Sequence, residues 1–267
     1  MTRIIDRLFG VEGKRVLVTG GSRGIGEMIA RGFVEAGARV YITSRKADAC
    51  EETAAALSKD GICRAIPADV SSVEGVDALR AALEEAEPSL DVLVNNAGAT
   101  WGAPLEEYPE AGWDKTFATN VKGVFFLTQR LLPMLRRAGT LEDPARVINI
   151  GSPNGEIVPR AGTNYAYSAS KAALHMLTRH LAAALGPQGI TVNTLVMGGF
   201  HTKMMAFVFD DPKAKAAVEA ANPLRRIGAP DDAAGTAIFL ASKAACYVNG
   251  AQLAVDGGHS VDPGGHF

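Results

Sequence analysis

The feature that most constrains this chain is a regular alternation of short β-branched runs with longer helical segments. Segments such as residues 25–36 and 49–57 repeat apolar side chains at a spacing near 3.6 residues, which is typical of amphipathic helices. The short runs are continuously apolar, as parallel strands are when helices bury both of their faces. The expected strands are residues 15–19, 39–43, 62–66, 90–94, 146–150, 190–195 and 251–254. The alternation therefore predicts an α/β fold: a doubly wound parallel sheet of about seven strands with helices on both faces.

Composition narrows the class of protein further. The 27 Lys and Arg residues nearly cancel the 29 Asp and Glu residues, which argues against a nucleic-acid partner. No run of 18 apolar residues is present to span a membrane, and the first ten residues lack an apolar signal core. Three cysteines without a CxxC pair suit the reducing cytoplasm. No repeat or low-complexity linker interrupts the chain, so we expect residues 1–267 to form a single domain.

A glycine-rich turn follows the first expected strand. The segment GGSRGIG, from Gly20 to Gly26, leads directly into an expected helix. Gly20 permits the tight turn, Gly24 lets the backbone approach a pyrophosphate at the helix N-terminus, and Gly26 allows close helix–strand packing. The order of strand, turn and helix therefore predicts a dinucleotide site on a Rossmann-type fold. A structural turn without a ligand is the alternative.

The end of the second expected strand indicates which dinucleotide would bind. An NAD enzyme usually carries Asp or Glu there for the ribose 2′-hydroxyl, whereas this chain has Ser44 and Arg45. Asp48 is the nearest carboxylate, but we expect it past the strand, at the start of the next helix. Arg23 in the glycine turn adds a second cation. Because guanidinium groups bind phosphate well, the residues favour NADP(H); two solvated surface arginines are the alternative.

Tyr167 and Lys171 are four residues apart, so on a helix they share one face. A free phenol has a pKa near 10, and lowering it to about 7 requires about 4 kcal/mol. One ammonium group at roughly 4 Å supplies about that much at an effective dielectric constant near 20. The pair is therefore a candidate tyrosine acid/base. Taken alone, the same spacing is more often a coincidence on a helix surface.

Several motifs in order carry a resemblance to a known family. They are TGGSRGIG at residues 19–26, NNAG at 95–98, Asn120 in TNVKG, Ser152 after VINIG, the Tyr167–Lys171 pair and DGG at 256–258. Along nearly its whole length the chain resembles the single-domain members of the short-chain dehydrogenase/reductase family. This resemblance implies an NADP-dependent oxidoreductase that acts on a carbonyl or alcohol, usually as a homo-oligomer, either tetramer or dimer.

The resemblance also implies roles for particular residues. Tyr167 would donate a proton to the carbonyl oxygen, and Ser152 would hydrogen-bond that oxygen. Lys171 would lower the pKa of the tyrosine and bind the nicotinamide ribose, and Asn120 would hold a water that relays protons. The expected cofactor-binding set is Gly20, Ser22, Arg23, Gly24, Ile25, Gly26, Ser44, Arg45, Asp69, Val70, Asn96, Ala97, Gly98, Tyr167, Lys171, Gly198 and Thr202.

One segment departs from the family pattern and from the rhythm of the chain. The family usually has PGxxxT after the sixth strand, but here Met197 replaces the proline, while Gly198 and Thr202 keep their places. We expect this stretch to be more flexible, because proline would have fixed the backbone. Residues 199–226 are expected to form a substrate flap, with an ordinary helical excursion as the alternative. Its apolar side chains are Met204, Met205, Phe207, Val208 and Phe209.

Other candidate residues carry weaker signals. The five histidines show no metal-ligand spacing, so no metal site is expected; His175 and His180 are expected in packing or at the surface, and His201 beside the pocket. Tyr165 has no lysine four residues on, so it is expected to line the pocket or to pack. Trp101 and Trp113 are expected to border the substrate or to pack. The tail at 260–267 is expected either to pack across a neighbouring subunit or to be disordered.

Within the family, the chain most resembles bacterial β-ketoacyl reductases of the rhamnolipid-associated type. The stretches AGATWGAPLEEYPEAGWDK, DPARVINIGS and AYSASKAALH carry this resemblance. It implies an NADPH-dependent reductase of β-ketoacyl thioesters. The alternatives are a reductase for another lipophilic ketone, a sugar or a steroid, and a nucleotide-binding regulator without turnover. The intact Ser152, Tyr167, Lys171 and Asn120 disfavour the regulator.

Overall fold

The computed structural model describes residues 3–159, 162–206 and 210–262. Its centre is a seven-stranded parallel sheet with the strand order β3-β2-β1-β4-β5-β6-β7. The strands are β1 (Arg15–Thr19), β2 (Arg39–Thr43), β3 (Ile62–Ala65), β4 (Val92–Asn95), β5 (Ala145–Gly151), β6 (Ile190–Met197) and β7 (Gln252–Val255). The predicted doubly wound parallel sheet is confirmed.

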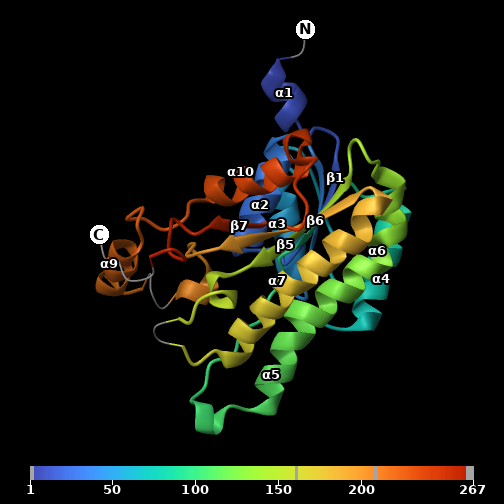
Figure 1. Ribbon diagram of the computed structural model, residues 1–267. Helices are drawn as coiled ribbons and strands as arrows, with labels where there is room; N and C mark the ends of the chain where they lie inside the picture. Colours follow the sequence, from blue (N-terminus) through green and yellow to red (C-terminus); the bar gives the residue numbers. More distant parts are fainter. Residues whose placement is uncertain (1–2, 160–161, 207–209, 263–267) are drawn as a thin grey trace.

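Helices cover both faces of this sheet (Figure 1). The α-helices are α1 (Ile4–Phe9), α2 (Gly24–Glu35), α3 (Ala47–Leu57), α4 (Val73–Ala86), α5 (Glu110–Phe117), α6 (Val124–Ala138), α7 (Tyr165–Leu185), α9 (Pro212–Ala221) and α10 (Pro230–Ala241). Short 3₁₀ turns are η1 (Leu105–Glu107), η3 (Pro153–Gly155), η4 (Gly186–Gln188), η5 (Lys203–Met205) and η6 (Lys243–Ala245), and η2 (Ala118–Gly123) is a π-helical turn. None of the helices described is long and apolar enough to cross a membrane.

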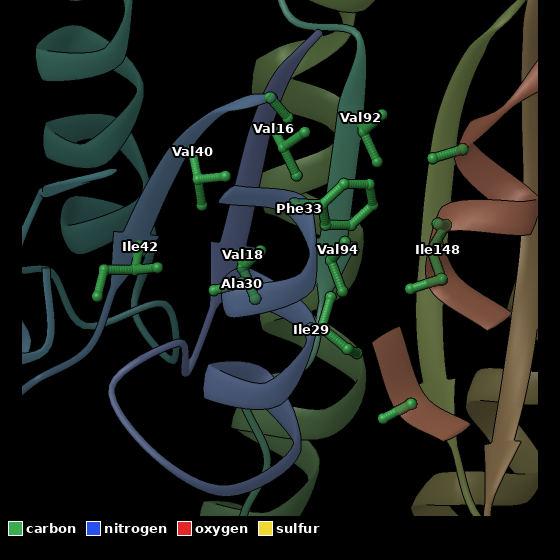
Figure 2. Close-up of a cluster of buried hydrophobic side chains, with 14 of the residues drawn as sticks. Val16, Val18, Ile29, Ala30, Phe33, Val40, Ile42, Val92, Val94 and Ile148 are labelled. Carbon is green, nitrogen blue, oxygen red and sulfur yellow. The ribbon is translucent and has the colours of Figure 1, made fainter. Parts of the chain in front are cut away.

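Alternation along the strands divides the core into two layers. On β1, Val16 and Val18 pack with α2, α3 and α10 on one face, and Leu17 packs with α4, α6 and α7 on the other. Figure 2 shows the first layer, where Phe33 of α2 lies over the strands. Both faces of β1, β4, β5 and β6 are buried, which explains why these strands are mostly apolar, whereas the edge strands β3 and β7 are partly exposed.

The strand order reverses between β1 and β4 in the middle of the sheet. From β1 the chain continues outward to β2 and β3 on one side, and from β4 it continues outward to β5, β6 and β7 on the other. In parallel sheets a crevice opens at such a switch point, beyond the carboxyl ends of the strands. The glycine turn after β1 and the segments after β4, β5 and β6 all meet at this edge. The fold therefore brings the expected site residues to one place.

Strands β3 to β7 begin or end one or two residues away from their predicted bounds, and two of these differences have identifiable reasons. Strand β4 begins at Val92, because the Leu90 backbone N–H donates to the Met134 carbonyl of α6 at 3.1 Å and the chain joins the sheet only after it. Strand β6 continues to Met197, which is buried and paired with Val255 of β7. The methionine that replaces the expected proline thus lies in the sheet, and it is not part of a loosened loop.

The proposed flap is only partly described. It includes η5 and α9, and the expected apolar residues Phe207, Val208 and Phe209 lie outside the described residues. Phe200, at its start, is only 2% exposed and packs in the core against Gly228. The first turn of the segment is therefore anchored. Beyond β7, the backbone N–H of Ser260 donates to Asp256 at 2.8 Å, and residues 263–267 lie outside the described part.

Candidate active site

The glycine turn has backbone angles that let a ligand approach the main chain closely. Gly20 and Gly24 have φ angles of +64° and +57°, a region that side chains disfavour. A Cβ atom on Gly26 would lie 2.4 Å from the Gly20 carbonyl oxygen. The turn therefore requires glycine at these three positions. It leads into α2, which has no side-chain cap, so backbone N–H groups of the first helical turn are available to an anion.

Asn96 holds the glycine turn against the end of β4. Its side-chain amide donates to the carbonyl oxygens of Thr19 at 2.8 Å and Gly20 at 3.2 Å. The Thr19 hydroxyl in turn accepts the backbone N–H groups of Asn96 and Ala97, each at 2.9 Å. The Asn96 side chain thus braces the turn, and its amide is not directed at a ligand. Gly98, two residues on, is exposed in the crevice.

The end of β2 lies directly beside the same turn. The Thr43 carbonyl accepts the backbone N–H groups of Gly20 at 2.7 Å and Gly21 at 3.3 Å. Arg45, two residues beyond Thr43, and Arg23 are both exposed, and neither forms an ion pair within the described residues. Two guanidinium groups near one turn are suited to a phosphate.

The remaining expected cofactor contacts near the glycine turn are hydrogen-bonded or packed within the protein. Ser22 and Ser44 mainly support the local backbone: the Ser22 carbonyl accepts from Thr53 at 3.1 Å, and the Ser44 hydroxyl donates to the Lys46 carbonyl at 3.1 Å. Asp69 accepts the backbone N–H and the hydroxyl of Ser71, so its carboxylate shapes the turn after β3. Val70 is buried, and Ile25 packs partly against the core.

The segment after β6 closes the crevice from the other side. A Cβ atom on Gly24 would lie 3.2 Å from the Thr202 methyl group, so this segment reaches the glycine turn. Gly198 has a different reason to be glycine, because a Cβ atom there would lie 2.6 Å from the Asp256 backbone. Glycine at position 198 therefore leaves room for the backbone of Asp256. Thr202 is therefore the better candidate for a ligand contact.

Ser152, Tyr167 and Lys171 meet at the carboxyl end of β5. Ser152 follows that strand directly and is 7% exposed; Tyr167 lies half-buried in the first turns of α7, and Lys171 lies one turn further and is buried. The Lys171 ammonium donates to the Ile150 carbonyl at 2.7 Å and stands 5.5 Å from the centre of the Tyr167 ring. The three expected catalytic side chains thus form one cluster.

Burial dominates the electrostatics of this cluster. Burial raises the pKa of the Tyr167 phenol above its ordinary value, and a hydrogen bond with Ser152 acts in the opposite direction. Burial also lowers the pKa of Lys171 to about 8. The Lys171 ammonium directs its hydrogen bond at the backbone of β5. The expectation that Lys171 lowers the pKa of Tyr167 stays a prediction.

Asn120 lies in the π-helical turn between α5 and α6 and is 1% exposed. Its side chain accepts the Ala99 backbone N–H at 2.8 Å, and it donates to the Ala99 carbonyl and to the Ser170 hydroxyl, each at 2.9 Å. Ser170 then donates to the Tyr167 carbonyl at 2.8 Å. Asn120 therefore connects the loop after β4 to the start of α7. Its side-chain amide is hydrogen-bonded to other groups of the protein.

The aromatic candidates form a cluster at the rim. Tyr165 is exposed and stands edge-on to Tyr108 at 5.7 Å, and Trp113 is edge-on to Tyr108 at 6.4 Å and stacks on Phe117. Trp101 is partly exposed, with the Lys115 ammonium 5.4 Å from its ring. Of these side chains, Tyr165 lines a cavity together with Asn154 and Ile157. No group of three or more potential metal ligands occurs in the part of the chain that the structure describes.

Sequence reasoning missed two polar features behind the site. The Asn95 amide donates to Asn149 at 2.9 Å, Asn149 donates to Thr178 at 2.8 Å, and Thr178 is 2.9 Å from Thr194. This buried chain links β4, β5, β6 and α7. The second feature is His175, whose ring packs directly under Ser152. The i+4 spacing of His175 from Lys171 was the signal for its shared helix face.

The fold and the residue cluster define a dinucleotide-dependent oxidoreductase, and comparisons with known proteins agree. The family model described as enoyl-(acyl carrier protein) reductase matches residues 20–260. The rhamnolipids biosynthesis 3-oxoacyl-(acyl-carrier-protein) reductase of Pseudomonas aeruginosa is 50% identical over 250 residues, which are 94% of this chain and 97% of that protein. Galactitol 2-dehydrogenase (L-tagatose-forming) of Cereibacter sphaeroides is 37% identical over 95% of this chain and 98% of its own.

A solved structure gives the same result. The Pseudomonas aeruginosa RhlG/NADP active-site complex superposes with a TM-score of 0.92 and 49% identity, over 95% of this chain and 99% of that one. The chain belongs to the short-chain dehydrogenase/reductase family, and it is an oxidoreductase.

Proposed function

We propose that this chain is an NADPH-dependent reductase that converts a 3-oxoacyl thioester into the 3-hydroxyacyl thioester. The observation that carries the proposal is the Ser152–Tyr167–Lys171 cluster at the crevice, in a chain half identical to a 3-oxoacyl reductase. The aromatic pair of Tyr108 and Tyr165 supplies surface for an acyl chain. The galactitol dehydrogenase relative supports the alternative, a sugar substrate.

The crevice suits NADPH on three observations: the glycine conformations, the uncapped start of α2, and the two arginines without ion pairs. In our proposal the glycine turn from Gly20 to Gly26 holds the pyrophosphate, and Arg23 and Arg45 hold the 2′-phosphate. The other expected cofactor contacts remain proposals as well, with Thr202 favoured over Gly198. When bound, the cofactor supplies the hydride.

The protein side of the reaction is proton transfer and orientation. The Ser152 hydroxyl donates a hydrogen bond to the carbonyl oxygen and stabilises the negative charge that develops there. Tyr167 donates its phenolic proton to the same oxygen. Since burial raises the pKa of this phenol, it stays protonated at neutral pH, which suits reduction. Lys171, with a pKa of about 8, is placed to return a proton to the site.

Purified protein, NADPH and a panel of ketones test the proposal. The panel contains 3-oxoacyl thioesters of several chain lengths, a keto sugar and a ketosteroid, and a 2-enoyl thioester controls for reduction of a carbon–carbon double bond. We expect the highest kcat/KM with a 3-oxoacyl thioester. A higher value with the keto sugar would establish the alternative.

The single domain over residues 1–267, the cytoplasmic location and the homo-oligomer remain proposals. Exposed apolar side chains on neighbouring helices support an oligomer: Trp113 on α5, Phe125 on α6 and Met176 on α7 are 42%, 37% and 53% exposed. Light scattering on the purified chain tests this point, and a monomer at micromolar concentration would contradict it.

A further inference from the structure

His175 occupies a buried position next to the catalytic cluster, and the roles above leave it without a function. It lies on α7, four residues after Lys171 and eight after Tyr167, so all three side chains share one helix face. The side chain is only 4% exposed. Its Nε2 atom accepts the backbone N–H of Ser152 at 3.4 Å. The imidazole thus contacts the residue that presents the hydroxyl to the substrate.

Two glycines leave the space that the imidazole ring occupies. A Cβ atom on Gly151, the last residue of β5, would lie 2.4 Å from Nε2, and one on Gly155 would lie 2.9 Å from Cε1. Contacts of that length do not occur between real side chains, so the ring fills the space that both glycines leave open. The ring is held between the strand that ends before Ser152 and the 3₁₀ turn η3 that follows it.

The hydrogen bond fixes the protonation of the ring. Because Nε2 accepts, the proton of the neutral ring is on Nδ1, which faces the Glu156 carboxylate at 3.5 Å. Burial, and then the Lys171 ammonium, lower the pKa of His175 to about 4. A second proton on Nε2 would point at the Ser152 N–H. The charged groups that face the ring are Lys171 on its own helix and Glu156 on the turn.

We propose that His175 is a positioning residue, whose neutral imidazole fixes the Ser152 main chain and thereby keeps the Ser152 hydroxyl beside Tyr167. The inference rests on the proposed carbonyl reduction, because it assigns the work of Ser152 to that reaction. The acceptor at Nε2 is the essential feature. A side chain with an acceptor at that place should replace histidine, and an apolar side chain of similar size should not.

Three variants separate these cases. His175→Gln carries a carbonyl oxygen near the place of Nε2, whereas His175→Met fills the space without an acceptor. His180→Met is the matched control, because His180 is exposed on the same helix. We expect His175→Met to lower kcat at least about tenfold with an unchanged KM for NADPH. We expect His175→Gln to stay within about threefold of wild type, and His180→Met to match it.

A second readout needs no substrate and so distinguishes failure of this inference from failure of the proposed function. Ser152 lowers the pKa of Tyr167, so displacing Ser152 should raise it further. The tyrosinate absorbance of each variant is titrated against a Tyr167→Phe background. We expect an upward shift in His175→Met alone. Turnover itself is measured with whichever carbonyl the wild type reduces.

The outcomes divide cleanly. Wild-type kcat and an unshifted phenol titration in folded His175→Met would overturn the proposal, as would equal damage in His175→Gln and His175→Met. Where His175→Met does not fold, Glu156→Leu leaves the imidazole in place and removes the carboxylate that faces Nδ1. We then expect a kcat loss of about threefold that Glu156→Gln does not share; equal, wild-type kcat in both would overturn the proposal.

Discussion

Replacing Arg45 by alanine should separate NADPH binding from NADH binding. Arg45 follows β2, whose last carbonyl is bonded to the glycine turn, and its exposed guanidinium has no ion-pair partner within the described residues. Because the side chain is exposed, the dielectric constant of water applies. At about 4 Å each pair of unit charges then contributes about 1 kcal/mol. A phosphate monoester carries a charge of nearly −2, so the loss is about 2 kcal/mol, or roughly 30-fold in Kd.

The assay is equilibrium binding of both cofactors to the wild type, Arg45→Ala and Arg7→Ala, at low and at high salt. Arg7 is the control, because it is exposed on α1, which precedes the amino end of β1 and projects away from the carboxyl edge (Figure 1). We expect Arg45→Ala to weaken NADPH about 30-fold and NADH less than twofold. The difference should shrink at high salt, because exposed charges are screened. Equal weakening of both cofactors, or none, would contradict the assignment of Arg45 to the 2′-phosphate.

Three further predictions test other parts of the site. Tyr167→Phe should lower kcat by about 10³-fold or more and leave NADPH binding nearly unchanged, since it removes only the proton donor; retained turnover would contradict the role. Gly26→Ala should cost about 1–3 kcal/mol of unfolding free energy, because its Cβ would lie 2.4 Å from the Gly20 carbonyl, whereas Gly235→Ala, with nothing within 4 Å, should stabilise α10 by about 0.5–1 kcal/mol in the same denaturant titration. The pKa of Lys171 falls from 10.5 to about 8 on folding, so between pH 8 and 10 the unfolded chain binds the extra proton and stability rises with pH. Relative to Lys171→Met, the wild type should gain about 2 kcal/mol over that range, and a flat difference would contradict the buried ammonium.

The sheet was predictable because each strand is a short run of mostly apolar, β-branched residues between helical segments. The glycine turn was predictable for a similar reason: its conformation depends on Gly20, Gly24 and Gly26, and each is needed locally. Strand ends were less accurate. The Leu90 N–H donates to Met134 of α6 and not to a neighbouring strand, and these two residues are far apart in the sequence.

Roles that depend on three-dimensional neighbours could not be read from spacing. Asn96 braces the glycine turn only because β1 and β4 are adjacent in the sheet. The Asn120 amide is hydrogen-bonded to the loop after β4. The i,i+4 spacing of Tyr167 and Lys171 gave their proximity correctly. It carried no information on burial, and burial determines the direction in which both pKa values move.

The same limit applies to Phe200 and His175. Phe200 was assigned to the flap from its place after the sixth strand, but its burial against Gly228 makes it part of the core. The contact of His175 with Ser152 joins residues that are 23 positions apart in the sequence. It exists only because α7 returns along β5.

Reduction of the keto group of an acyl thioester with NADPH is the reaction that we propose for this crevice. NADPH oxidation with a 3-oxoacyl thioester tests it, followed in the near ultraviolet, with identification of the product and with Tyr167→Phe as control. We expect the wild type to form the 3-hydroxyacyl thioester and the variant not to form it. Absence of that product from a wild type that binds NADPH and reduces the keto sugar would overturn the proposed reaction.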